Sequence, residues 1–162
     1  MKTLLILRHG KSSWKRPGAD HDRPLNKRGN SDAPRVGKVL RDADLAPDLI
    51  ISSTAERARR TAEKVAEHSG YTGAVELSSD LYLAGPEGYQ RVLCRVPDAL
   101  EHVLVVGHNP GAEMLLEFLT GRSETLPTAA LARVRLEIER WSDLDGGARG
   151  VLVELWRPLM LV

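Results

Sequence analysis

Short runs of apolar residues, each closed by polar or glycine-containing sequence, recur along the first two thirds of the chain. Continuous apolar runs of this length are typical of strands that are buried on both faces of a parallel sheet. They predict four strands, at residues 3–7, 48–51, 74–77 and 102–106.

The segments between these runs carry apolar residues at helical spacing. They predict four helices, at residues 31–42, 54–69, 87–95 and 110–119. Pro34 fits the first of these helices only within its first turn, because proline lacks the N–H that later turns require. The alternation of strands and helices favours an α/β fold, a three-layer αβα sandwich around a mixed, mainly parallel sheet.

The last third of the chain has a different pattern. Two further strands are predicted at residues 130–138 and 150–156, and a turn-rich segment joins them into an antiparallel hairpin at the sheet edge. Residues 11–27 are rich in Pro, Gly and Asp and predict a long functional loop after the first strand. Because no repeat or linker interrupts the chain, we expect residues 1–162 to form a single domain.

Composition narrows the function classes. The 42% hydrophobic and 28% charged fractions argue against disorder, and a net charge of +1 gives no global attraction to nucleic acid or membrane. Cys94 is the only cysteine, which excludes an intrachain disulfide and cysteine-based zinc sites. The apolar run before Arg8 is too short for a signal peptide or a membrane span, so the expected location is cytoplasmic.

Candidate chemistry follows the predicted strands at the points where they end. Arg8 and His9 follow the first strand, Arg57 lies early in the helix after the second, Asp80 follows the third, and His108 follows the fourth. Ligands of open α/β sheets bind outside the carboxyl ends of the strands. These side chains are therefore expected to meet at one edge of the sheet.

Two helix starts support an anion site at that edge. If Ser53 or Thr54 caps the second helix, the Arg57 side chain leans back over the strand end, where the helix dipole also attracts an anion. Asn109 followed by Pro110 is expected to cap the fourth helix and to hold His108 just before its N-terminus. Arginine forks match phosphate oxygens in bidentate geometry.

No metal-ligand set and no serine-histidine-acid order is evident, so a histidine is the candidate nucleophile, without metal or cofactor. It must be neutral to attack, and two nearby arginines disfavour its charged form, which lowers its pKa. The same arginines would stabilise the charge on a transferring phosphoryl group.

These motifs resemble the histidine phosphatase superfamily, also called the phosphoglycerate mutase-like family. Arg8-His9-Gly10 matches its first motif, the run from Ser53 through Arg57 to Thr61-Ala62 its second, and Gly107-His108 its third. Short length, the sequence after His9 and the Arg23-Pro24-Leu25 segment make the chain most similar to the SixA-type branch of phosphohistidine phosphatases. The resemblance implies a phosphorylated His9 in a pocket formed by Arg8, Arg57 and His108.

Two roles stay open at this point. Mutase-like members have a glutamate proton donor after the third strand, where this chain has the shorter Asp80. Either Asp80 or His108 would then protonate the leaving group, and Asp80 could instead cap a turn. Ser12 either donates to the phosphate or caps its own loop.

The expected function is metal-independent removal of phosphate from phosphohistidine on a protein. A chain of this length has no room for a large lid, so an open pocket is expected. The alternatives are a small-molecule phosphatase, acting on a sugar phosphate or nucleotide, and a non-catalytic phosphoprotein-binding module. The presence of His9 counts against the binding module.

Overall fold

The computed structural model describes residues 1–15, 17–146 and 149–158. These residues form a six-stranded sheet in the order β3-β2-β4-β1-β5-β6. Strands β1 to β4 are parallel, β5 is antiparallel to β1, and β6 is antiparallel to β5. The strands are β1 (Lys2–Arg8), β2 (Leu49–Ser53), β3 (Val75–Ser78), β4 (His102–Gly107), β5 (Leu131–Leu136) and β6 (Gly150–Trp156).

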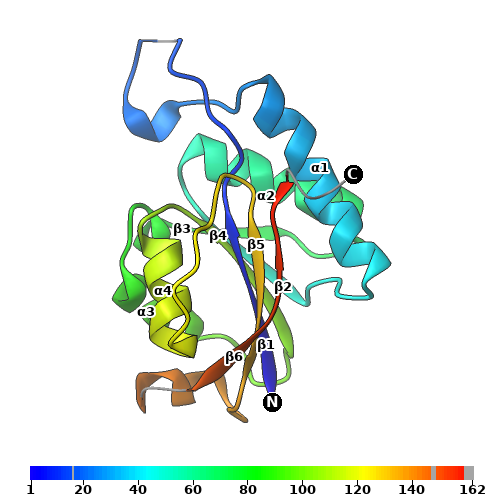
Figure 1. Cartoon of the computed structure of the whole chain (residues 1–162), viewed down its shortest axis with the longest axis vertical. Helices are drawn as coiled ribbons and strands as arrows, with labels where there is room; N and C mark the ends of the chain where they lie inside the picture. Colours follow the sequence, from blue (N-terminus) through cyan, green and yellow to red (C-terminus); the bar gives the residue numbers. More distant parts are fainter. Residues whose placement is uncertain (16, 147–148, 159–162) are drawn as a thin grey trace.

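Two pairs of helices cover the two faces of the sheet (Figure 1). They are α1 (Lys27–Asp42) with α2 (Glu56–Ser69) on one face, and α3 (Pro86–Leu93) with α4 (Gly111–Thr120) on the other. The predicted three-layer fold and its antiparallel edge pair are thereby confirmed.

The central strand β1 shows why its sequence is continuously apolar. Leu4 and Ile6 point into the core under α3 and α4, whereas Leu5 and Leu7 point into the core under α1 and α2. All four side chains are fully buried, because successive residues of a strand face opposite sides. Each burial contributes about 1.5–3 kcal/mol, which fixes the strand that carries Arg8 and His9 at its end.

Helix α1 begins earlier than the sequence predicts. The side chain of Asn26 accepts a hydrogen bond from the N–H of Gly29 (2.9 Å) and caps the helix, which starts at Lys27. Pro34 therefore lies in the interior of the helix, and the prediction that it lies in the first turn is wrong. The bond that Pro34 cannot make would go to the carbonyl of Asn30, which is an exposed residue.

The predicted caps of α2 and α4 are also wrong. Helix α2 starts after Ala55, and Ser53 accepts from the N–H of Ala55 rather than from inside the helix. Helix α4 starts after Pro110, and the Asn109 amide donates to Glu113 and to the carbonyl of Leu126. The side chains of Ser53 and Asn109 bind groups in the loops that follow β2 and β4, so they do not cap the helices.

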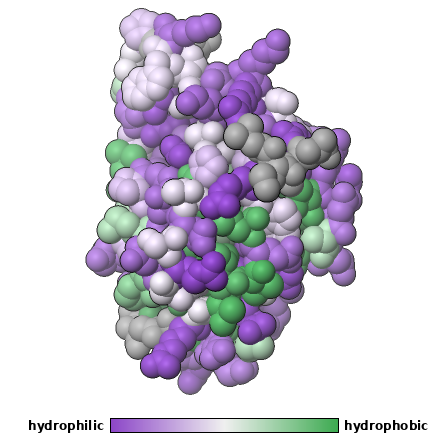
Figure 2. All heavy atoms as spheres, viewed as in Figure 1, coloured by the Kyte–Doolittle hydropathy of each residue, from purple (hydrophilic) through white to green (hydrophobic). Residues whose placement is uncertain are grey.

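The surface divides into polar and apolar regions. Val151 and Val153 of the edge strand β6 are partly exposed, and Figure 2 shows hydrophobic residues gathered over this part of the face. The opposite end, formed by the loop between β1 and α1, is predominantly hydrophilic. Among the described residues, no helix has the length and apolar character needed to cross a bilayer.

Candidate active site

A cavity of about 280 Å³ lies at the carboxyl ends of the parallel strands. It is at the end of the molecule where the loop between β1 and α1 rises above the sheet (Figure 1). Five of the predicted site residues line it: Arg8, His9, Ser12, Arg57 and His108. In the structure these five side chains thus lie in one cavity, at the sheet edge where the strand ends meet.

His9 is held in a defined orientation directly after β1. Its backbone N–H donates to the carbonyl of Gly107 at the end of β4 (3.0 Å), and its side chain is almost fully buried. Ring atom Nδ1 lies 2.7 Å from the carbonyl oxygen of Gly10. Because a carbonyl can only accept, Nδ1 carries the proton and Nε2 keeps its lone pair. A neutral His9 in this tautomer can attack phosphorus through Nε2.

The second motif connects α2 to the loop that follows His9. Thr61 donates to the carbonyl of Arg57 (2.7 Å) and accepts from the N–H of Gly10 (3.0 Å). Ala62, the next residue, is fully buried in the core between α2 and the sheet. The spacing of four residues places Arg57 and Thr61 on one face of the helix, so the arginine and the nucleophile loop are fixed together.

His108 lies beside His9 and belongs to the same cavity. The two ring centres are 5.0 Å apart, and His108 Nε2 is 2.8 Å from the hydroxyl of Ser53. Since that hydroxyl accepts from the N–H of Ala55 (3.2 Å), its own hydrogen is available for Nε2. This arrangement favours a neutral His108 with its proton on Nδ1, a nitrogen that has no partner among the described residues.

Arg8 is anchored by the loop that contains Leu126. It donates to the carbonyl of Leu126 (3.0 Å), which also accepts from Asn109 (2.9 Å). Glu113 accepts from Asn109 and from the N–H of Leu126, so one carboxylate of α4 fixes this loop. Asn109 thus positions the arginine pocket instead of capping its helix.

Burial and charge keep both histidines neutral. Burial lowers the pKa of His9 to about 4, with a further lowering from the nearby guanidinium of Arg57. Burial lowers the pKa of His108 to about 3, with additional repulsion from His9 and Arg57. These directions agree with the sequence argument, although desolvation contributes more than the arginines do.

An NMR titration of the imidazole C–H signals tests this electrostatic environment. We expect the His9 and His108 signals to stay constant from pH 7.5 to about 5.5, whereas an exposed histidine titrates near 6.5. Because the unfolded chain takes up these protons near pH 6.5 and the folded chain does not, stability falls as pH drops from about 6.5 toward 4. For His9 the full loss is about 3 kcal/mol. A midpoint near 6.5 for either ring contradicts the neutral site.

A carboxylate that the sequence did not indicate lies in the cavity. Asp20, in the short 3₁₀ helix Asp20–Asp22, accepts from Arg57 (Nη2, 3.0 Å), Arg23 (Nε, 3.1 Å) and the hydroxyl of Tyr82 (2.6 Å). Its backbone carbonyl also accepts from Arg57 (2.7 Å). The hydrogen bond from Tyr82 and the Arg57 guanidinium hold the pKa of Asp20 well below its usual range. Asp20 is therefore ionised and holds the Arg57 fork in place.

Asp80 is not among the residues that line this cavity. It lies in the 3₁₀ helix Ser79–Leu81, and its carboxylate pairs with Arg91 of α3 at 3.6 Å. Ser12 does reach the cavity, where its hydroxyl accepts from Arg23 (2.7 Å). The hydroxyl hydrogen of Ser12 is still able to donate to a bound anion.

Asp20 and Arg23 were missed because they lie within the loop between β1 and α1 and do not follow a strand end directly. The loop between β1 and α1 folds back over the cavity through a bridge between Ser12 and Leu25. Residues eleven and fourteen positions after His9 are brought next to it in this way. The length and charge of the loop were the only indications in the sequence.

Comparison with known proteins identifies the family. The sequence model of the histidine phosphatase superfamily (branch 1) matches residues 4–82, which contain the first two motifs. An uncharacterized protein of Mycobacterium tuberculosis is 34% identical over 157 residues, covering 90% of this chain and 96% of the relative.

Solved structures extend the match over the whole fold. A protein histidine phosphatase SixA complexed with tungstate superposes with a TM-score of 0.86 at 22% identity, covering 99% of both chains. A putative phosphohistidine phosphatase SixA from Agrobacterium tumefaciens gives a TM-score of 0.82 at 28% identity, covering 97% of this chain and 98% of that one. The chain belongs to the histidine phosphatase superfamily, within its SixA-type branch, as its motifs predict. It is a phosphatase.

Proposed function

We propose that the chain hydrolyses phosphorylated substrates without a metal ion through a phosphohistidine formed on His9, and that its substrate is phosphohistidine on a protein. The observation that carries the proposal is the His9 ring, buried and neutral with Nε2 free, between the guanidinium groups of Arg8 and Arg57. A neutral nucleophile among fixed cations is what phosphoryl transfer requires.

In the first step, His9 Nε2 attacks phosphorus and the bond from phosphorus to the leaving group breaks. Arg8 and Arg57 donate to the non-bridging oxygens, whose charge is redistributed during transfer, and neutral His108 lies beside His9 in the same cavity. An imidazole leaving group departs readily when its ring has taken up a proton. A phosphohistidine substrate that enters protonated therefore needs little help from a carboxylic acid of the enzyme.

In the second step, water attacks the phosphoryl group on His9. A P–O bond forms, the P–Nε2 bond breaks, and inorganic phosphate leaves. The two protons of the attacking water stay with the phosphate, which leaves as H2PO4−, because hydrogen bonds from Tyr82, Arg57 and Arg23 make the Asp20 carboxylate too weak a base to take one. His9 returns to its neutral state because burial and the arginines disfavour its protonated form.

The choice of a protein substrate is supported by the shape of the site and by similarity. The cavity has a volume of about 280 Å³, just below the usual range for small-molecule pockets, and within the described chain the loop between β1 and α1 is the segment that folds over it. A phosphorylated side chain on a protein surface can enter such a site end-on. The name of the Agrobacterium tumefaciens structure, at 28% identity, points to the same substrate.

A competition assay tests the proposed substrate. In the presence of EDTA, the protein is given a phosphohistidine-containing protein together with a panel of sugar phosphates and nucleotides. We expect full activity in EDTA, because the arginines carry out the charge stabilisation that a divalent ion supplies elsewhere, and preferential release of phosphate from phosphohistidine. Preference for a small phosphate would assign the chain to small-molecule metabolism, and binding without turnover would make it a binding module.

A pair of variants distinguishes the roles of the carboxylates of Asp20 and Asp80. Asp20→Asn removes the charge that holds Arg57, so we expect kcat to fall about tenfold while inorganic phosphate binds at least as tightly, since a nearby negative charge is lost. Asp80→Asn is expected to leave the rates on alkyl and nitrophenyl phosphates unchanged, because its carboxylate lies outside the cavity. Slowing of the alkyl ester alone by Asp80→Asn would instead identify Asp80 as the proton donor.

A further inference from the structure

A second cavity adjoins the candidate active site. It has a volume of about 790 Å³ and shares Lys11, Ser12 and Trp14 with the catalytic cavity. We call it the basic groove, because its lining contains four cationic side chains and no acidic one: Lys11, Lys15, Lys27 and Arg28. A substrate that places its phosphate beside His9 extends into the groove as it leaves the smaller cavity.

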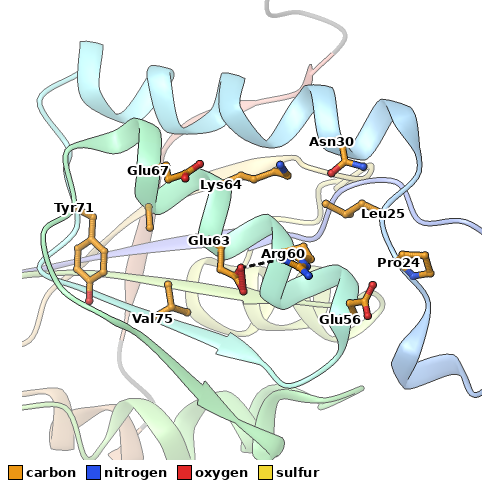
Figure 3. A pocket seen from close by; sticks show the side chains of 11 residues that line it. Pro24, Leu25, Asn30, Glu56, Arg60, Glu63, Lys64, Glu67, Tyr71 and Val75 are labelled. Carbon is orange, nitrogen blue, oxygen red and sulfur yellow. Dashed lines mark ion pairs between the residues drawn. The ribbon is translucent and has the colours of Figure 1, made fainter.

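This concentration of positive charge is not a property of the chain as a whole. The whole chain has 23 basic and 22 acidic residues, so its overall charge is nearly balanced. A neighbouring cavity of about 600 Å³ beside α2 shows the ordinary mixture, with three glutamates lying among Arg60 and Lys64 (Figure 3). The basic groove therefore differs in composition from this neighbouring cavity.

Two cations of the groove lie at a helix N-terminus, where positive charge is unfavourable for folding. Lys27 and Arg28 are the first two residues of α1, and the first turn of this helix contains no acidic residue. Positive side chains at a helix N-terminus are unfavourable, because the helix dipole is positive there. Arg28 has a partner in Asp32, but no ion pair forms with Lys11, Lys15 or Lys27 among the described residues. An anion in the groove would relieve this repulsion.

The groove is also fixed in position relative to the nucleophile. The carbonyl of Lys11 accepts from the N–H of Asn26 (2.9 Å) and lies so close to Gly29 that a Cβ there would be 2.2 Å away. Only glycine at that position allows the loop to pack against the first turn of α1. The strand end that carries His9 and the helix that carries Lys27 are thereby joined.

Trp14 forms the wall between the two cavities. Its ring is 76% exposed, yet the Arg23 guanidinium lies 3.5 Å from the ring centre and covers one face. Arg23 is itself held by Asp20 and Ser12. An exposed aromatic ring that is fixed by cation–π contact and hydrogen bonds offers its free face to a ligand.

From this arrangement we infer that the basic groove binds an acidic segment of the polypeptide that carries the phosphorylated side chain. The inference rests on the proposed function, since it assumes a protein substrate. Three of the four cations are exposed lysines, which are flexible point charges that accept anions in varied positions. A site for one particular second phosphate would instead present fixed arginine forks, as the catalytic cavity does.

Two phosphohistidine peptides of equal length test the inference, one flanked by glutamates and one by glutamines. At low ionic strength we expect the wild type to prefer the acidic peptide about tenfold in kcat/KM, mainly through KM, and the preference to fade as salt is added. In the double variant Lys15→Gln/Lys27→Gln, the ratio of the two kcat/KM values should fall to about twofold or less. Lys38→Gln, an exposed lysine farther along α1, is the matched control and should keep the wild-type ratio.

Other outcomes would distinguish failure of the acidic-segment site from failure of the proposed protein substrate. Equal rates on both peptides in the wild type, or an unchanged ratio in the double variant, would overturn the acidic-segment site while leaving the protein substrate intact. If neither peptide is hydrolysed but nitrophenyl phosphate is, the proposed protein substrate fails. In that case a sugar bisphosphate preferred over its monophosphate, with the preference lost in the double variant, would assign the groove to a small molecule.

Discussion

His9→Ala is expected to lower the turnover of every phosphate substrate by about three orders of magnitude or more, the effect of removing a covalent nucleophile. Wild-type protein quenched shortly after mixing with radiolabelled substrate should carry a label that is lost in acid and kept in base, as expected for phosphohistidine. The label should map to His9, because this ring is buried beside both arginines with Nε2 available for attack.

His102→Ala provides the matched control for this experiment. His102 lies at the start of β4 and its ring is near Asp48, 3.7 Å away, far along the strand from the cavity. This variant should keep both turnover and label. Thermal unfolding of the His9→Ala protein shows whether the fold survives. Near-normal turnover by a folded His9→Ala protein would rule out the covalent mechanism.

The layers of the fold were predictable because each buried strand leaves a distinct local pattern. The strands around Leu5 and Leu104 must be apolar on both faces, and only a sheet covered on both sides requires this. The helix starts were not predictable with the same accuracy. Asn109 and Ser53 have side chains that cap helices well, but here they make tertiary hydrogen bonds to the carbonyl of Leu126 and to His108. The capping propensity of a residue does not depend on partners that are distant in the sequence, so it cannot predict these bonds.

The same distinction applies to the site. Residues at strand ends, such as His9 and His108, were found because parallel strands bring their carboxyl ends to one edge. Asp20 and Arg23 reach the cavity only through the folding of the loop between β1 and α1. Asp80 also follows a strand, but its carboxylate turns toward Arg91. Order along the chain thus predicts positions at the sheet edge but not the directions of side chains in loops.

Arg57→Lys is expected to reduce kcat/KM by about two orders of magnitude and to weaken inhibition by vanadate by a similar factor. Lysine keeps the charge, so the loss measures the fork itself, which makes two charge-assisted hydrogen bonds of about 1.5–3 kcal/mol each at most. In the structure this fork is held by the backbone and carboxylate of Asp20 (2.7 and 3.0 Å), contacts that a lysine cannot make together.

Arg59→Lys is the control for the Arg57 experiment, because Arg59 lies on the same helix but pairs with Glu63 (2.9 Å) and does not line the cavity. It should keep wild-type rates and wild-type vanadate inhibition. Equal melting temperatures for the two variants would show that the loss arises in the site and not in the fold. If Arg57→Lys leaves both kcat/KM and vanadate inhibition unchanged, Arg57 does not bind the phosphoryl group, and its two hydrogen bonds to Asp20 serve only to fasten the loop.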